Sequence, residues 1–187
     1  LVGSEMCIRD SSSVDLVITS PPYANAIDYM RAHKFSLVWL GEPVAKLSAL
    51  RSTYVGSENC QGFVENELPP KTAGQVAALT ARDERKARIL SKYLGDMERI
   101  LAEILRVLRP GRAAGIVVGP STMRGIRIQT HEHLAEIASR IGFDVVGIAE
   151  RKLDRDRRMM PTGLNKGSMN GIEQRVHEEF VIGLTKP

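Results

Sequence analysis

Apolar residues in this chain gather in short blocks separated by polar, glycine- and proline-containing segments. Residues 14–18 form an apolar, β-branched run that stops just before Pro21-Pro22, a pattern that predicts a buried strand ending in a stiff loop. Three later runs of the same kind predict further strands. They cover residues 113–118, 143–148 and 180–184.

Helical periodicity separates most of these predicted strands. Residues 83–108 carry apolar side chains at steps of three and four, and Pro110-Gly111 ends the pattern. Residues 130–141 repeat it, and residues 27–40 show an imperfect apolar face. Periodicity is weak between about residues 42 and 82, above all over 50–80, so we expect an insertion or a mobile loop there.

The order of these elements predicts an α/β fold. Strands alternate with helices along most of the chain, which is typical of a parallel sheet. No helical segment separates the last two strands, so we expect the final strand to insert antiparallel to its neighbours. The length suits a single domain over residues 14–187. Residues 1–13 carry no strand or helix pattern and are predicted to be a non-native leader or a disordered terminus.

The composition restricts the setting of the protein more than its chemistry. Hydrophobic residues make up 43% of the chain, which argues against disorder, and no run is long enough to span a bilayer, so we expect no membrane partner. Cys7 and Cys60 are too few for a disulfide framework or a zinc site, so we expect a reducing, cytoplasmic compartment. The net charge of +4 is compatible with a polyanionic partner without requiring one.

The segment Thr19-Ser20-Pro21-Pro22-Tyr23 carries the candidate chemistry. It follows the first predicted strand directly, and ligands bind at the carboxyl ends of strands in open α/β sheets. Proline fixes the backbone, so the loop presents a hydroxyl, carbonyls and an aromatic ring in set directions. These groups suit a flat heterocycle with an exocyclic amino group. A proline-rich turn with a packed tyrosine is the plain alternative.

Asp15 to Tyr23 resembles the catalytic motif of the amino-group DNA methyltransferases. Serine at the first motif position, here Ser20, is commonest in the cytosine-N4 enzymes, whereas aspartate or asparagine leans towards adenine-N6. Segments further along the chain also resemble that family and follow in its order. They are residues 24–29, 37–41, 105–111 and 116–119.

The resemblance implies a Rossmann-like sheet, S-adenosylmethionine as cofactor, DNA as partner and a catalytic loop of Ser20, Pro21, Pro22 and Tyr23. The target amine would donate hydrogen bonds to the Ser20 hydroxyl and the Pro21 carbonyl, and Tyr23 would stack on a flipped base. Thr19, Ser20 and Asn25 are the cofactor-binding candidates. Asn25 and Asp28 could both line the cofactor or base pocket, although Asp28 fits a charge at a helix start as well.

One family feature is missing from the sequence. No glycine-rich turn between a strand and a helix precedes residue 14, and the glycines between Gly111 and Gly125 lack the required spacing. We therefore expect this chain to be the catalytic half of a methyltransferase, truncated at its N-terminus. Alone it should bind S-adenosylmethionine weakly and be inactive.

Basic residues supply candidate DNA contacts. Arg31 and Lys34 follow the catalytic loop, and a dense run includes Arg155, Arg157 and Arg158 after Arg151 and Lys152. Solvated surface is the alternative for both groups. His131 and His133 do not suggest a metal site, because residues two apart on a helix do not face together. Glu178 and Glu179 are expected to begin the last strand as solvent-facing charge.

The sequence therefore favours a DNA methyltransferase acting on an exocyclic base amine, with cytosine N4 first. Adenine-N6 methylation of DNA and guanosine-N2 methylation of RNA remain open, since related loops serve both. A non-catalytic nucleic-acid-binding remnant also remains open, because the cofactor turn is absent. The oligomeric state cannot be predicted.

Overall fold

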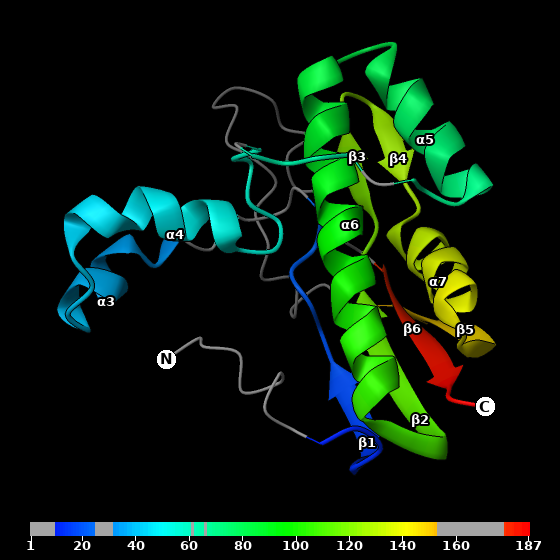
Figure 1. Ribbon diagram of the computed structural model, residues 1–187. Coiled ribbons are helices and arrows are strands. Elements are labelled where there is room, and N and C mark those ends of the chain that lie inside the picture. Colours follow the sequence, from blue (N-terminus) through cyan, green and yellow to red (C-terminus); the bar gives the residue numbers. More distant parts are fainter. Residues whose placement is uncertain (1–9, 25–31, 61, 66, 153–177) are drawn as a thin grey trace.

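The computed structural model describes residues 10–24, 32–60, 62–65, 67–152 and 178–187. Figure 1 shows a layer of helices packed on one side of a sheet, with a short helical arm standing apart from this body. No helix in these described ranges is long and apolar enough to cross a membrane.

The four predicted strands form one central sheet, as expected from the sequence. Its strands are β1 (Val14–Thr19), β2 (Leu108–Val118), β5 (Asp144–Lys152) and β6 (Glu178–Thr185), in the order β1-β2-β6-β5. β1 runs parallel to β2, and β6 runs antiparallel to both of its neighbours. The α/β fold class and the antiparallel last strand are therefore confirmed.

Two predicted helices cover one face of this sheet. α6 (Glu84–Val107) begins at Asp83, whose side chain accepts a hydrogen bond from the amide of Lys86 at 2.9 Å. α7 (Thr130–Ile141) ends at Gly142, which adopts a φ of 109° that glycine tolerates best. Buried side chains from α6, α7 and alternate positions of β2 and β6 form the core. They include Leu94, Leu101, Leu134, Ile116 and Ile182.

The segment predicted as an insertion or mobile loop contains regular structure. It holds a short 3-10 helix (Val44–Lys46), α4 (Leu47–Thr53) and α5 (Pro70–Thr80). A loop without regular structure is therefore wrong for these residues, whereas an insertion stays a prediction. The sequence of α5 does not show an apolar helical face, because small and polar residues fill most positions and Leu79 is its only buried large apolar side chain. It packs against α6 and α7 nevertheless.

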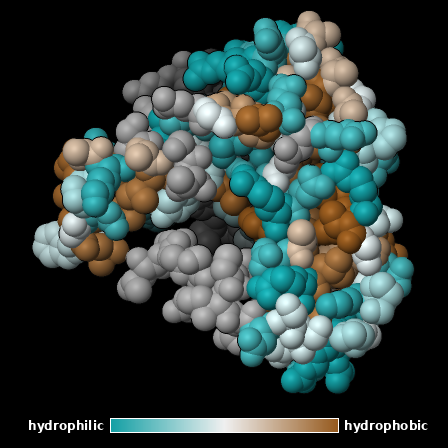
Figure 2. All heavy atoms as spheres, viewed as in Figure 1, coloured by the Kyte–Doolittle hydropathy of each residue, from teal (hydrophilic) through white to brown (hydrophobic). Residues whose placement is uncertain are grey.

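The helix predicted over residues 27–40 is confirmed in part. α3 (Lys34–Trp39) lies within it, whereas residues 25–31 lie outside the described ranges. Its apolar side chains are not buried: Phe35 is 85% exposed and Trp39 is 90% exposed. α3 and α4 form the arm seen in Figure 1, and Figure 2 shows hydrophobic surface on it.

A small hairpin after β2 is not predicted by the sequence pattern. β3 (Ser121–Met123) pairs antiparallel with β4 (Ile126–Ile128) across the two-residue turn Arg124-Gly125. Both turn residues have positive φ, 52° and 75°, as the tight primed hairpin turns require. Arginine is unusual at the first of these positions, which explains why the local sequence does not indicate the turn.

Candidate active site

The predicted catalytic loop lies at the carboxyl end of the parallel pair β1 and β2. Thr19 ends β1 and pairs with Ile116 of β2, so Ser20 begins the loop at the edge where parallel strands present ligands. Ser20 is exposed, whereas Pro21 is buried and Tyr23 is only 8% exposed. The loop therefore offers one hydroxyl to solvent from an otherwise packed segment.

Residues 54–60, which we call the strap, pack against this loop. A Cβ added to the buried Gly56 would lie 3.6 Å from the Cβ of Pro22, so the two backbones approach closely. Gly56 has a φ of 80°, a conformation that favours glycine. The strap therefore requires glycine at the position where it meets the loop.

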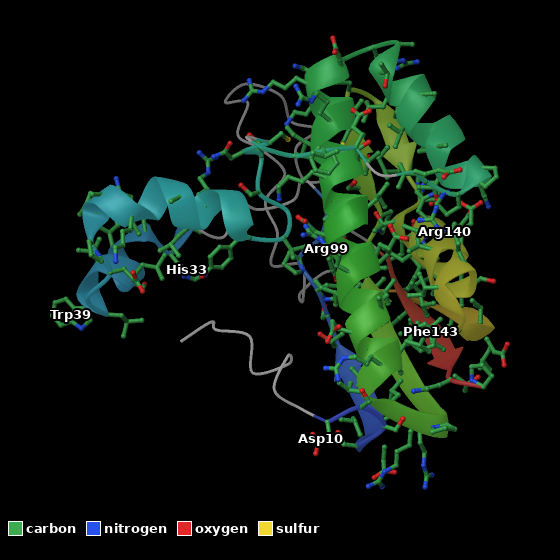
Figure 3. All side chains as sticks on the ribbon, in the orientation of Figure 1. Asp10, His33, Trp39, Arg99, Arg140 and Phe143 are labelled. Carbon is green, nitrogen blue, oxygen red and sulfur yellow. The ribbon has the colours of Figure 1, made fainter. Side chains whose placement is uncertain are left out.

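Two lysines of α6 attach the strap to the body. Lys92 Nζ donates to the carbonyl of Tyr54 at 3.3 Å, and Lys86 Nζ pairs with Glu58 at 2.9 Å. Lys92 also pairs with Asp96 at 2.7 Å, and both side chains are buried. Arg99 completes the cluster on the side of α6 that faces the arm, whereas Arg140 lies on the far side with α7 (Figure 3).

Tyr23 reaches across to the start of the last strand. Its hydroxyl donates to Glu179 Oε1 at 2.6 Å, and Glu179 Oε2 pairs with Arg151 near the end of β5. The Glu179 side chain is only 15% exposed. The neighbouring Glu178 pairs with Arg127 of β4. The expectation that both glutamates face solvent is wrong, because each is a partner for an arginine and one also holds the tyrosine.

The two histidines of α7 are buried and separate. The ring of His131 stacks on Phe180 with centroids 3.5 Å apart, while His133 Nδ1 lies 3.2 Å from Thr72 Oγ1. Burial lowers the pKa of both imidazoles, which favours the neutral form. No group of three metal-ligating side chains occurs among the described residues. The helix predicted over residues 130–141 is confirmed, and both histidines pack on its buried side.

Glu136 of α7 holds the first turn of α5. Its carboxylate accepts hydrogen bonds from the amides of Lys71 and Thr72, at 3.0 and 2.8 Å, and from Thr72 Oγ1 at 2.6 Å. Burial opposes ionisation of this carboxyl, but the hydrogen bonds from Thr72 and Lys71 outweigh it and lower the pKa of Glu136. α5 is thus capped by a neighbouring helix.

The predicted DNA-contact residues are described only in part. Lys34 is exposed on α3, and Arg151 and Lys152 are exposed at the end of β5. Residues 25–31 and 153–177, which contain Asn25, Arg31 and the run of arginines from 155, lie outside the described ranges. The prediction that these two basic groups contact DNA beside the loop therefore stays a prediction.

Two of the three cofactor-binding candidates, Thr19 and Ser20, lie among the described residues. Thr19 is half-buried and Ser20 exposed, so polar atoms are present at the end of β1. The glycine that packs on this loop, Gly56, is used to seat the strap against Pro22.

The chain is similar in sequence to type II DNA methyltransferases. This similarity confirms the resemblance to DNA methyltransferases that the sequence analysis described. It is 28% identical to M.AvaI of Nostoc sp. and of Anabaena variabilis over 177 residues, covering 82% of this chain. It is 23% identical to M.MvaI of Kocuria varians over 134 residues, covering 66% of it. The chain spans about a third of the length of these curated relatives (34% and 30%). No family model matches it.

Two solved structures overlay on nearly the whole chain. One is a protein of Thermus thermophilus described as a DNA modification methylase, which in its complex with S-adenosyl-L-methionine is 18% identical with a TM-score of 0.48. The other is PvuII DNA methyltransferase, described as cytosine-N4-specific, at 14% identity and the same TM-score. The alignments cover 97% of this chain and 49% and 45% of those chains.

Sequence reasoning identifies neither the strap nor Glu179 as part of the site. Glu179 lies 156 positions from Tyr23, so no local spacing links them. The strap falls in a segment without periodicity, and its one informative residue, Gly56, resembles any loop glycine. The signal available in principle was the short polar start Glu178-Glu179 on an otherwise apolar strand.

Proposed function

We propose that the whole protein transfers a methyl group from S-adenosylmethionine to an exocyclic base amine of DNA, with cytosine N4 as the leading target. The observation that carries this proposal is the loop after β1. It places an exposed serine hydroxyl on a buried, proline-stiffened segment at the carboxyl end of a parallel strand pair. The similarity to type II DNA methyltransferases supports the same reaction.

Ser20 and Pro21 would act on the amine by hydrogen bonding. An amine conjugated to a base ring is a weak nucleophile, because its lone pair is delocalised into the ring. Acceptors at the Ser20 hydroxyl and the Pro21 carbonyl would draw the nitrogen towards a tetrahedral geometry and stabilise the positive charge that develops on it. The cofactor, when bound, supplies the electrophilic methyl group. No cysteine nucleophile is needed.

The choice of target base rests on Ser20. Serine at this position favours cytosine N4 over adenine N6, and related loops also act on guanosine N2 of RNA. We infer that the 187-residue chain alone is inactive, since its residues lack the glycine-rich cofactor turn. The non-catalytic alternative predicts that no longer form of the protein methylates either. Mapping methylation at single-base resolution on DNA and RNA distinguishes cytosine N4, adenine N6, guanosine N2 and the non-catalytic alternative.

DNA would be held by basic residues around the loop. Arg31 and Lys34 follow it in sequence, and Arg155, Arg157 and Arg158 form the densest basic run. Reversing the charge of these last three arginines should weaken DNA binding and flatten its salt dependence, because each phosphate contact releases counterions. An unchanged salt slope would assign the run to solvated surface.

Ser20→Ala in the whole protein tests the proposal. Losing one preorganised acceptor costs on the order of 3 kcal/mol, so the single-turnover methylation rate should fall about a hundredfold with little change in DNA affinity. Ser13→Ala is the matched control. Ser13 lies just before the first residue of β1, whereas Ser20 lies just after the last one, and the Ser13 hydroxyl donates to the Asp10 carbonyl. A parental rate for Ser20→Ala would remove the catalytic role of this loop.

A further inference from the structure

Tyr23 of the catalytic loop is fixed both through its backbone and through its side-chain hydroxyl. At one end the ring is attached to backbone that Pro21 and Pro22 stiffen. At the other end the hydroxyl donates to Glu179 Oε1 at 2.6 Å. Glu179 belongs to β6 and is paired there with Arg151 of β5, so the acceptor is part of the sheet rather than of another loop.

We propose that Glu179 is a positioning residue that anchors the catalytic loop to the sheet through the Tyr23 hydroxyl. This inference rests on the proposed function, since the loop is taken to be the one that binds the amine. It assigns Tyr23 a second task. The hydroxyl fixes where the loop lies, and the loop in turn fixes the direction of the exposed hydroxyl of Ser20, which lies earlier in the same loop.

Burial supports an anchor at this position. A tyrosine that serves as an open stacking platform needs an exposed ring face, whereas Tyr23 is 8% exposed. Stacking of a base on it would require the segments around it to move. The hydroxyl contact, by contrast, is already made, and a short bond to a carboxylate is stronger than one between neutral groups.

Arg151 orients the carboxylate of Glu179. Its guanidinium pairs with Glu179 Oε2 and leaves Oε1 to accept from Tyr23. Arg151 and Glu179 are register partners on adjacent strands, so the pair sits across one rung of the ladder. The carboxylate is thus oriented by β5 while it holds a loop that follows β1.

Loop anchoring can be measured on this chain without any enzymatic assay. Glu179→Gln keeps the side-chain shape and removes its charge, and Tyr23→Phe keeps the ring and removes the hydroxyl. Both variants should speed exchange of the backbone amides at position 23 and at Ala24 about tenfold, the scale of one lost charge-assisted hydrogen bond. Glu179→Gln should also raise nitration of Tyr23 by tetranitromethane by a similar factor, with the buried Tyr93 as internal reference.

Glu178→Gln is the matched control. It changes the adjacent residue of the same strand and removes an equivalent arginine pair, but the pair it removes is with Arg127 of β4. Exchange and nitration of the loop should stay within about twofold of the parental values, since the charge-assisted bond between Tyr23 and Glu179 is kept. If Glu179→Gln behaves like Glu178→Gln in both measurements, Glu179 does not anchor the loop.

A double-mutant cycle in the whole protein connects the anchor to catalysis. Tyr23→Phe and Glu179→Gln should each slow single-turnover methylation about tenfold, and the double variant no further, because both remove one bond. A platform role alone predicts a parental rate for Tyr23→Phe, since the ring remains, and that result would overturn the anchor. If the parental protein does not methylate DNA at all, the proposed function fails, while the exchange and nitration results still decide whether Glu179 anchors the loop.

Discussion

The two faces of the central sheet differ sharply. On the face that α6 and α7 cover, Ile116 and Ile182 are 0% and 1% exposed. On the opposite face, Leu16 and Ile18 of β1 are 57% and 73% exposed. The register makes the contrast local, because Ile18 pairs with Gly115, the residue just before Ile116.

The exposed face of β1 shows that the sequence of a strand can indicate a covering layer that is missing from the described residues. β1 carries apolar side chains on both of its sides, as strands covered on both faces do. Val17 is half-buried on the helix side, whereas Leu16 and Ile18 alternate with it and point the other way. Among the described elements, β1 makes its main contacts with β2. The pattern of β1 thus predicts a second covering layer that these elements do not provide.

The largest expected effect is on the covered face. Ile116→Ala should lower the free energy of unfolding by about 2–5 kcal/mol, the range for removing a large aliphatic side chain from a packed core. Urea unfolding of the 187-residue chain measures it. A loss below about 1 kcal/mol would show that the helices do not pack on β2 as tightly as full burial of Ile116 implies.

Lowering the pH should cause a smaller loss of unfolding free energy, again through residues on the covered face. Burial lowers the pKa of His131 and His133 below the usual 6.5, so the unfolded chain takes up protons at a higher pH than the folded one. Stability is therefore fully present above the usual pKa of 6.5 and is lost as the pH falls from there towards the lower folded pKa values. We expect a loss on the order of 1 kcal/mol between about pH 7.5 and about pH 5.5.

Variants assign this acid sensitivity to the buried rings. Replacing both histidines by glutamine should flatten the dependence of unfolding free energy on pH in that interval. His33→Gln, on the exposed arm, is the matched control and should leave the slope as it is in the parental chain. An unchanged slope in the double variant would place the titrating groups elsewhere. Glu136 should affect the unfolding free energy only at lower pH. The pKa of its carboxyl is lowered, and its hydrogen bonds to α5 are lost only when it is protonated.

The contrast between the faces also explains which parts of the fold the sequence could predict. The four strands of the central sheet and the helices α6 and α7 have clear apolar patterns, and the sequence predicts all of them. Buried side chains of α6, α7, β2 and β6 form the core. α5 packs with small side chains and is capped by Glu136 from another helix, so its stability is tertiary and leaves little periodicity. The hairpin of β3 and β4 depends on a turn whose first residue, Arg124, has a positive φ that is unusual for arginine.

The candidate site could be predicted where its chemistry is local. Ser20 to Tyr23 form one short motif, so their position after a strand could be read directly. The contacts that hold them come from afar: Glu179 from β6, and Gly56 from a strap that Lys92 attaches to α6. Such partners are set by topology, and in the sequence they look like ordinary charged or loop residues.

The smallest effect should come from the opposite face. Ile18→Ala makes the same substitution as Ile116→Ala on the neighbouring strand, but the side chain is 73% exposed, so only strand propensity is lost. The cost should be at most about 1 kcal/mol in urea unfolding of this chain. A cost of about 2 kcal/mol or more would show that Ile18 is covered, since exposed positions away from special features rarely reach that value. Measured again in a longer form of the protein, the same substitution tests the second layer directly. Its cost should rise towards that of Ile116→Ala if another segment buries this face, because apolar area removed from water is what the substitution senses.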